Sequence, residues 1–203
     1  NKADWWLAYT DMSVPLIEKS GFPQKRITVL NNTIDTQEFR KNYANLTNDK
    51  IQEIRNKHKI IGNNIGIFIG SLYEEKRIDF LLDSALLIKK SLPDFELIIA
   101  GDGKQKDLVI EYALKYEWIH YVGLVKGIEK ATLLYLSKVM LNPGLVGLGI
   151  LDSFLSNTPL VTTDCGLHSP EVVYLENMTN GLMTLNDLDV FSSNVISLFQ
   201  NKK

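Results

Sequence analysis

The chain has 203 residues, of which 45% are hydrophobic and 23% are charged, a balance typical of folded globular domains and not of disordered or fibrous chains. Its 22 Lys and Arg residues against 24 Asp and Glu residues give a net charge of −2, which argues against a nucleic-acid-binding protein. A single cysteine, Cys165, excludes a disulfide framework and a structural zinc site built on thiolates. No apolar run is long enough to cross a bilayer, so we expect a soluble domain of a reducing compartment.

Short apolar runs alternate with amphipathic segments from one end of the chain to the other, which predicts an α/β fold with a doubly wound, mostly parallel Rossmann-like sheet. The expected strands are Trp5–Tyr9, Ile27–Leu30, Ile65–Ile69, Phe95–Ala100, Ile119–Val122, Val139–Leu141, Leu160–Thr163 and Gly181–Met183. The expected helices are one with Pro15 near its start, then Asp49–His58, Asp79–Ser91, Gln105–Tyr116, Glu129–Ser137, Leu148–Leu155, Pro170–Leu175 and Asp187–Gln200. The buried stripe of the helix Asp79–Ser91 is expected to contain Phe80, Leu82, Leu86 and Leu87.

A polar stretch rich in Asn and Lys, residues 35–59, interrupts this alternation and carries only the helix Asp49–His58. Such a shift in composition is typical of a domain boundary. We therefore expect a small strand–helix–strand unit over 1–34, a linker with one helix over 35–59, and the main domain over 60–203. Because the chain opens on Asn1 and not on methionine, we expect it to be part of a longer protein.

Glycine-containing turns follow three of the predicted strands: Gly70-Ser71, Gly101-Asp102-Gly103 and Gly123. Open parallel sheets bind ligands at the carboxyl ends of their strands, where these turns fall. Glycine there lets backbone N–H groups approach a ligand, and the start of the following helix favours anions. The three turns together predict a ligand site along this edge of the sheet.

The segment from Asn142 to Asp152 gives the most specific indication of chemistry. It leaves a strand, passes through Gly144, Gly147 and Gly149, and enters a helix. This arrangement predicts a cradle for a phosphate or diphosphate, with the Asp152 carboxylate placed to accept hydrogen bonds from a ribose. It is neither a P-loop nor a G-x-G-x-x-G motif, because the spacing and the Gly-Lys-[Ser/Thr] ending do not match. The alternative is a glycine turn needed only for close packing of helix on strand.

A series of motifs along almost the whole chain resembles the nucleotide-sugar-binding half of retaining GT-B glycosyltransferases of the family-four (glycosyl transferases group 1) type. The stretches that carry the resemblance are Ile27–Asp35 followed by Phe39, Phe68–Arg77, Leu97–Gly103, Tyr121–Val125, Gly144–Asp152 on the E-x7-E motif, Asn157–Val161, and Ser169–Val172. The resemblance implies the C-terminal half of a GT-B fold over 60–203, truncated at its C-terminus, with residues 1–34 as a remnant of the N-terminal acceptor domain.

The family's activity is the transfer of a hexosyl group from a nucleotide-diphosphate sugar to a glycan or lipid-linked acceptor with retention of configuration. The resemblance therefore implies a nucleotide-sugar co-substrate, no metal and no other cofactor, and no nucleic-acid partner. It also implies a cytoplasmic protein that can lie at the inner face of a membrane. We expect this chain alone to bind nucleotide without catalysing transfer, because the acceptor-activating residues belong to the other half.

By the resemblance, Lys76 binds the donor diphosphate, and Gly147, Leu148 and Gly149 offer it backbone N–H groups. Asp152 holds the ribose hydroxyls, and Val125 lines the nucleobase pocket. The complete set of expected donor-site residues is Gly70, Ser71, Lys76, Arg77, Gly101, Gly103, Val125, Gly144, Gly147, Leu148, Gly149, Asp152 and His168. No catalytic residue and no metal ligand is expected within this chain.

The chain departs from the family pattern at several of these positions. Gly144 replaces the first glutamate of E-x7-E, Asp152 shortens the second, and Ser71 replaces an arginine, for which Arg77 could substitute. These departures leave open a non-catalytic nucleotide- or sugar-binding module. A nucleotide-sugar epimerase or a dinucleotide oxidoreductase is a further alternative, because such folds host many functions, although the lack of a G-x-G-x-x-G motif argues against the oxidoreductase.

Two further histidines are expected to have no part in the chemistry. We expect His58 on a solvated helix face and His120 as a hydrogen-bonded structural residue.

Overall fold

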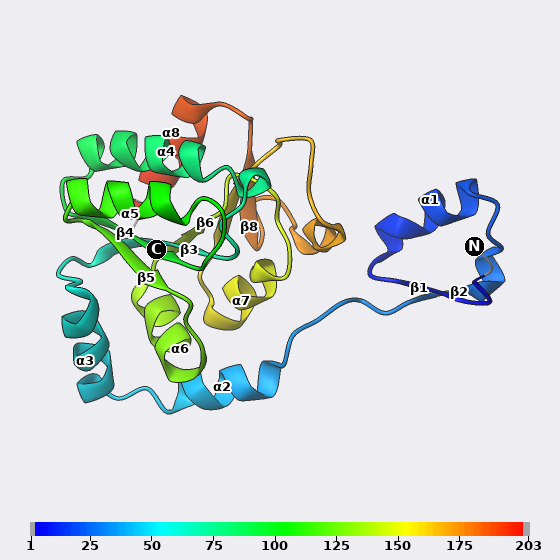
Figure 1. Cartoon of the computed structure of the whole chain (residues 1–203), viewed down its shortest axis with the longest axis horizontal. Coiled ribbons are helices and arrows are strands. Elements are labelled where there is room, and N and C mark those ends of the chain that lie inside the picture. Colours follow the sequence, from blue (N-terminus) through cyan, green and yellow to red (C-terminus); the bar gives the residue numbers. More distant parts are fainter. Residues whose placement is uncertain (1–2, 201–203) are drawn as a thin grey trace.

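The computed structural model describes residues 3–200, and within them the largest element is a six-stranded parallel sheet (Figure 1). Its strand order is β5-β4-β3-β6-β7-β8. The strands are β3 (Asn64–Ile69), β4 (Phe95–Ala100), β5 (Ile119–Gly123), β6 (Val139–Leu141), β7 (Leu160–Thr163) and β8 (Gly181–Thr184). All neighbouring strands pair in parallel, which confirms the predicted doubly wound α/β fold.

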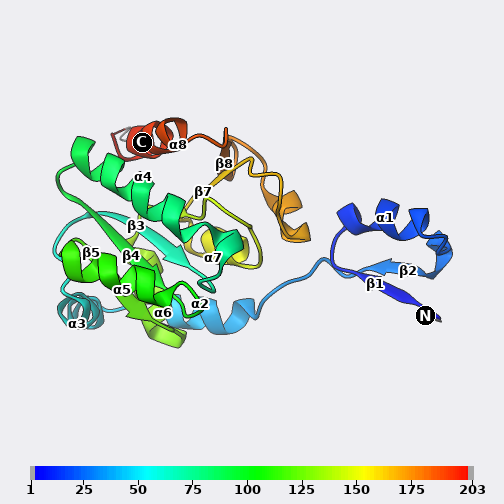
Figure 2. The same cartoon turned by 45° about the horizontal axis from the view of Figure 1, so that its top comes forward.

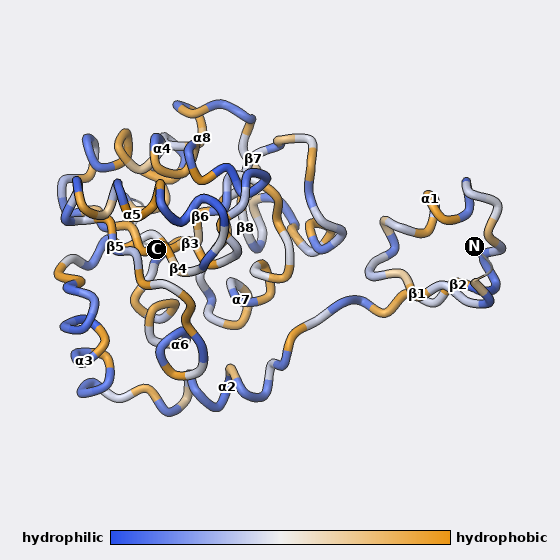
Figure 3. The backbone as a smooth tube through the Cα atoms, in the orientation of Figure 1, coloured by the Kyte–Doolittle hydropathy of each residue, from blue (hydrophilic) through white to orange (hydrophobic). Residues whose placement is uncertain are grey.

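Helices cover both faces of the sheet (Figure 2), and a separate hydrophobic core lies on each face. One core lies under α4 (Ile78–Ser91), α5 (Lys106–Lys115) and α8 (Leu188–Gln200). The other lies under α2 (Thr36–Ala44), α3 (Asn48–His58), α6 (Gly127–Leu136) and α7 (Gly149–Ser156). Because both faces are covered, the central strands are largely hydrophobic (Figure 3), and β4 is buried at every position.

The chain reverses its direction across the sheet between β3 and β6. From β3 it proceeds through β4 to β5, then returns to place β6 on the other side of β3 and continues to β8. Such a topological switch point leaves a crevice at the carboxyl ends of the two strands, where doubly wound sheets bind their ligands. The turn that begins at Gly70 and the loop after Leu141 meet at this crevice.

The structure corrects three local predictions. The polar stretch after Asp35 contains a second helix, α2, because the Asp35 carboxylate caps it by accepting from the N–H groups of Gln37 and Glu38. The expected helix at Pro170 is a 3₁₀ turn, η4 (Pro170–Tyr174). In α4 the buried stripe consists of Ile78, Leu81, Leu82, Ser84, Ala85 and Ile88, whereas Phe80, Leu86 and Leu87 lie at its margins.

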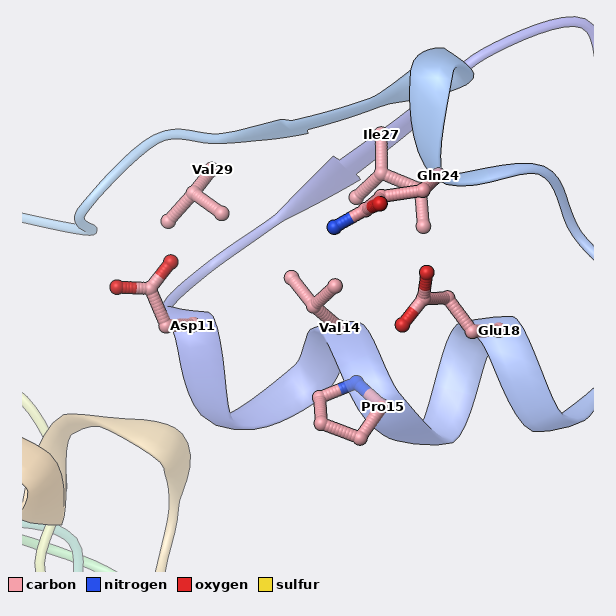
Figure 4. A pocket seen from close by; sticks show the side chains of 7 residues that line it. All are labelled: Asp11, Val14, Pro15, Glu18, Gln24, Ile27 and Val29. Atoms are coloured by element: carbon pink, nitrogen blue, oxygen red, sulfur yellow. The ribbon is translucent and has the colours of Figure 1, made fainter.

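A small βαβ unit precedes the main sheet. Strand β1 (Trp6–Ala8) pairs in parallel with β2 (Ile27–Val29), and the segment between them contains η1 (Asp11–Ser13), α1 (Val14–Lys19) and η2 (Gln24–Arg26). A groove of about 410 Å³ lies between α1 and β2, and Figure 4 shows the side chains that line it. Its lining residues are Asp11, Val14, Pro15, Glu18, Gln24, Ile27 and Val29, none of which is an expected donor-site residue.

An extended segment connects this unit to α2 and is held to η4 at Asn32. The Asn32 amide donates to the Glu171 carboxylate at 2.8 Å, and the Tyr174 hydroxyl donates to the Asn32 carbonyl at 3.2 Å. Glu171 is only 4% exposed, so its carboxylate is buried by this contact. The preceding residue, Asn31, adopts a left-handed conformation (φ 52°), which asparagine tolerates better than most residues.

At the amino ends of the strands, the buried Glu96 of β4 binds the segment that leads into β3. Its carboxylate accepts from the N–H groups of Ile61 and Gly62 and hydrogen-bonds to His120 at 2.8 Å, which confirms His120 as a satisfied structural histidine. The expectation for His58 is wrong. Its ring is almost enclosed and contacts Glu129 of α6 at 2.7 Å, because α3 packs against α6.

We predict that the stability of the fold falls as the pH is lowered from 7.5 to 5.5. Burial lowers the pKa of His120 below its ordinary 6.5, although the hydrogen bond and charge of Glu96 act in the other direction. The unfolded chain therefore takes up this proton at a higher pH than the folded chain. The stabilisation is complete above about pH 6.5 and is lost as the pH falls from there towards the folded-state pKa.

Thermal unfolding of the wild type and a His120→Gln variant at pH 7.5, 6.5 and 5.5 tests this. Glutamine can still donate to Glu96 but does not titrate, so the variant should lose less of its Tm across the range. His168 has a lowered pKa with the same sign and supplies part of the remaining slope. Equal losses of Tm in the wild type and the variant would contradict the prediction.

Candidate donor-binding site

The crevice between β3 and β6 is closed by a direct backbone contact at Gly144. A Cβ atom added there would lie 2.2 Å from the carbonyl oxygen of Glu75 and 2.6 Å from the carbonyl carbon of Lys76. The next residue, Leu145, donates its N–H to the same Glu75 carbonyl at 2.7 Å. The loop after β6 thus lies directly on η3 (Glu74–Lys76), and no side chain fits at position 144.

This contact brings the Lys76 side chain beneath the glycine loop. Lys76 is 8% exposed, and its ammonium donates to the Leu145 carbonyl. It forms no ion pair with any of residues 3–200. Burial lowers the pKa of Lys76 to about 8, and the more distant charge of Glu171 partly offsets this. The crevice therefore contains a buried cation without a contacting anion, which is costly unless a ligand supplies the charge.

The start of α7 presents three backbone donors beside this cation. The N–H groups of Gly147, Leu148 and Gly149 form no hydrogen bond with residues 3–200. Unpaired N–H groups at a helix start carry partial positive charge and favour an anion. Neither Gly147 nor Gly149 is sterically required in this structure, because an added Cβ would have its nearest neighbours at 3.7 Å and 3.5 Å.

His168 holds the glycine loop from the other side. Its Nδ1 accepts from the Val146 N–H at 3.1 Å, and its Nε2 lies 3.0 Å from the Thr163 carbonyl. These partners assign the neutral tautomer that carries its proton on Nε2. Burial lowers the pKa of His168, which keeps this tautomer at neutral pH. The structure therefore places His168 beside the loop as a support for its backbone.

Asp152 lies in the first turn of α7 and is 6% exposed. Lys130 of α6 approaches its Oδ1 at 2.7 Å. Burial raises the pKa of Asp152, while the charge and hydrogen bond of Lys130 lower it. Its second oxygen, Oδ2, accepts no hydrogen bond from the residues that the structure describes.

Arg77 binds protein groups in this structure. It has a left-handed backbone conformation (φ 55°), and its guanidinium lies 2.6 Å from Asn186 Oδ1 and 3.1 Å from the Thr163 hydroxyl. The same group stacks over Phe80 with 4.3 Å to the ring centre. A cavity of about 470 Å³ borders it, lined by Glu74, Arg77, Asp79, Lys104 and Gln105.

The remaining expected residues lie at the same edge of the sheet. Gly101 (φ 152°) is sterically required, because an added Cβ would lie 1.8 Å from the Gly70 carbonyl oxygen. Gly103 (φ 153°) is required for the same reason, with the Leu72 carbonyl at 2.4 Å. These contacts account for both glycines by packing of one turn on the next. Ser71 is exposed after β3, and Val125 is half-buried before α6.

The sequence analysis missed several groups that the structure brings to the crevice: Lys130, Thr163, Glu171 and Asn186. Glu171 lies in the Ser169–Val172 motif, which could have indicated it. Lys130, Thr163 and Asn186 carry no such signal, because their partners are distant in the chain.

Comparison with known proteins identifies the chain's relatives. The family model for Glycosyl transferases group 1 matches residues 63–201, more than half of the chain. The chain belongs to this family. Alpha-monoglucosyldiacylglycerol synthase of Acholeplasma laidlawii is 25% identical over 141 residues, which is 66% of this chain and 35% of that protein.

Solved structures of glycosyltransferases share the fold. Anabaena HepE in complex with UDP has a TM-score of 0.75 at 16% identity, covering 98% of this chain and 54% of that chain. A glycosyltransferase from Rickettsia africae has a TM-score of 0.78 at 17% identity, covering 97% and 53%. The chain thus spans about half the length of these structures, and its fold is that of the C-terminal half of a GT-B glycosyltransferase, as the motifs implied. Within residues 3–200, no helix combines the length and apolarity needed to cross a membrane.

We predict that Gly144→Ala destabilises the protein by about 1–3 kcal/mol, because an added Cβ forces the backbone of η3 and the loop apart. Gly144→Glu, which restores the residue typical of the family, should be at least as harmful. Urea unfolding measures the effect. The matched control is Gly147→Ala in the same loop, where the nearest neighbour would be Ser169 Oγ at 3.7 Å and the change should stay within about 0.5 kcal/mol. Equal stabilities of Gly144→Ala and Gly147→Ala would refute the steric argument.

Proposed function

We propose that this chain binds the nucleotide-diphosphate sugar donor of a glycosyltransferase in the crevice between β3 and β6. The observation that carries the proposal is the buried ammonium of Lys76, which has no ion-pair partner among residues 3–200 and lies beside a loop with unpaired N–H groups. A diphosphate would supply the missing negative charge and accept hydrogen bonds from the start of α7.

The relatives support a uridine nucleotide as the first ligand to test. Structures of Anabaena HepE were solved with UDP, with UDP and glucose, and with UDP-glucose. Family membership supports transfer of the sugar to an acceptor. For this chain we propose a hexosyl group, a glycan or lipid-linked acceptor held by the other half of the protein, and retention of configuration.

In the proposed reaction, the bond between the anomeric carbon and the diphosphate breaks and a bond from that carbon to the acceptor's hydroxyl oxygen forms. The hydroxyl proton is released, and negative charge develops on the leaving diphosphate. Lys76 and the N–H groups of Gly147, Leu148 and Gly149 would stabilise that charge from fixed positions. Asp152 would accept from the ribose, and the segment around Val125 would line the nucleobase. We propose that this stabilisation needs no metal ion. Among the described residues, no cluster of three or more His, Cys, Asp or Glu side chains could hold one.

We predict that UDP stabilises the chain in a thermal-shift assay, and that Lys76→Met weakens UDP binding at least tenfold, because a charge-assisted hydrogen bond is lost. The panel should include UDP, GDP, ADP, CMP and NAD at millimolar concentration. Affinity for the diphosphate should also fall as the pH rises above about 8, where free Lys76 loses its proton. Calorimetric titration at pH 7 and pH 9 measures both effects.

The matched control is Lys138→Met, which removes the same charge at the opposite end of β6, where Lys138 contacts Asn64. This variant should bind UDP as the wild type does. A wild-type chain that responds to no nucleoside diphosphate would refute the proposed function. Equal weakening by the two lysine variants would show that only overall charge matters.

Gly144 favours a second candidate, a nucleotide-binding protein without transferase activity. The family's glutamate at this position cannot be accommodated by the backbone seen here. The two candidates differ in the longer protein: a transferase releases free nucleotide when given donor and acceptor, whereas a binding protein retains its donor intact.

A further inference from the structure

The ion pair between Lys130 and Asp152 connects the two helices whose starts border the crevice. Lys130 is the fourth residue of α6, and Asp152 is the fourth residue of α7. Side chains in a helix lean towards its N-terminus, so both groups lean towards the carboxyl edge of the sheet. The two helices pack against each other on one face of the sheet (Figure 1). The pair therefore lies between the Val125 segment and the glycine loop.

The pair has both hydrogen-bond donors and an acceptor oxygen that no described residue uses. The Lys130 ammonium has three donors and forms an ion pair at 2.7 Å with Asp152 Oδ1, an oxygen otherwise buried without a hydrogen-bond partner among the described residues. Asp152 Oδ2 accepts nothing from the described residues. The Lys130 side chain is 25% exposed, whereas that of Asp152 is 8% exposed, so the ammonium is the more accessible partner.

Neighbouring contacts fix the position of Lys130. The adjacent Glu129 binds both Lys57 and His58 of α3, at 2.6 Å and 2.7 Å. These bonds anchor the first turn of α6 on its outer side. Lys130 itself faces Asp152, and its positive charge offsets part of the rise that burial causes in the pKa of this carboxylate.

We propose that Lys130 is a donor-binding residue that recognises the ribose diol together with Asp152. A vicinal diol offers O–H donors to the free carboxylate oxygen and hydroxyl oxygens that accept from the ammonium, so it satisfies both members of the pair at once. The proposal rests on the proposed function, because it names how the nucleotide's ribose is held. It also accounts for an aspartate at position 152 in place of the family's longer glutamate, because Lys130 contacts the ribose hydroxyls that the shorter side chain cannot contact alone.

The test compares three probes by calorimetric titration: UDP, 2′,3′-dideoxy-UDP and inorganic pyrophosphate. The ratio of the affinities for UDP and dideoxy-UDP measures recognition of the diol, and pyrophosphate reports the phosphate cradle alone. We expect a ratio of at least ten for the wild type. Asp152→Asn should lower the ratio, and the double variant Lys130→Met/Asp152→Asn should bring it close to one. Pyrophosphate affinity should stay within twofold throughout.

The double variant and a control variant keep the proposal falsifiable if an unpaired charge disturbs folding. The double variant removes both charges together and leaves no buried carboxylate alone. Lys57→Met removes a lysine that contacts the neighbouring Glu129 and should leave the ratio unchanged. In a folded Lys130→Met single variant, the ratio should fall as the pH is lowered from 7 to 5, because Asp152 loses the cation that offsets the effect of burial, and its pKa rises further.

Each outcome has a distinct meaning. A wild type that binds neither pyrophosphate nor any nucleoside diphosphate of the panel overturns the proposed function itself. A wild type that binds both UDP and dideoxy-UDP equally well overturns the role of the pair in diol recognition and leaves the phosphate cradle standing. Equal loss of UDP and pyrophosphate affinity on removal of Lys130 would assign this residue to the phosphates and refute its role at the ribose.

Discussion

The contact of Gly144 with the carbonyl groups of η3 is the constraint on which the rest of the crevice depends. Without a side chain, the loop after β6 lies directly on Glu75 and Lys76, at the point where the chain reverses across the sheet. The contact sends the Lys76 side chain beneath the loop, where the Leu145 carbonyl receives its ammonium. The absence of a side chain at position 144 therefore allows the two backbone segments to lie in direct contact, and no functional side chain can be placed there.

The junction gives the crevice an uneven distribution of charge. At its η3 end, the buried ammonium of Lys76 is balanced only through space by Glu171. At its α6–α7 end, the charges of Lys130 and Asp152 neutralise each other in contact. The first end attracts anions, whereas the second suits a neutral group with many hydroxyls. One elongated ligand with an anionic part and a hydroxyl-rich part matches both ends.

Much of this arrangement could be predicted from the sequence, since short apolar runs and glycine turns are local signals. Each predicted strand is present, and the glycine loop lies at the switch point. Helix α2 was missed because its sequence is polar, and it depends on the Asp35 cap and on Phe39 buried in the core beneath it. The partners of His58 and Lys130 could not be predicted, because helix packing brings together residues that are distant in the chain. The tight approach at Gly144 was equally hidden, since a glycine in a sequence does not reveal which atoms lie against it.

The hydrogen bond from Asn32 to Glu171 makes the attachment of the N-terminal unit sensitive to deamidation. The Asn32 side chain serves the buried Glu171 only as a donor, through its amide nitrogen. Deamidation, to which asparagine is prone, would turn that donor into a second carboxylate facing the first. A hydrogen bond would become a repulsion between like charges, and only the bond from the Tyr174 hydroxyl to the Asn32 carbonyl would remain of the two described at this point. As a preparation is stored and Asn32 deamidates, the contact between the N-terminal βαβ unit and the main domain would therefore weaken.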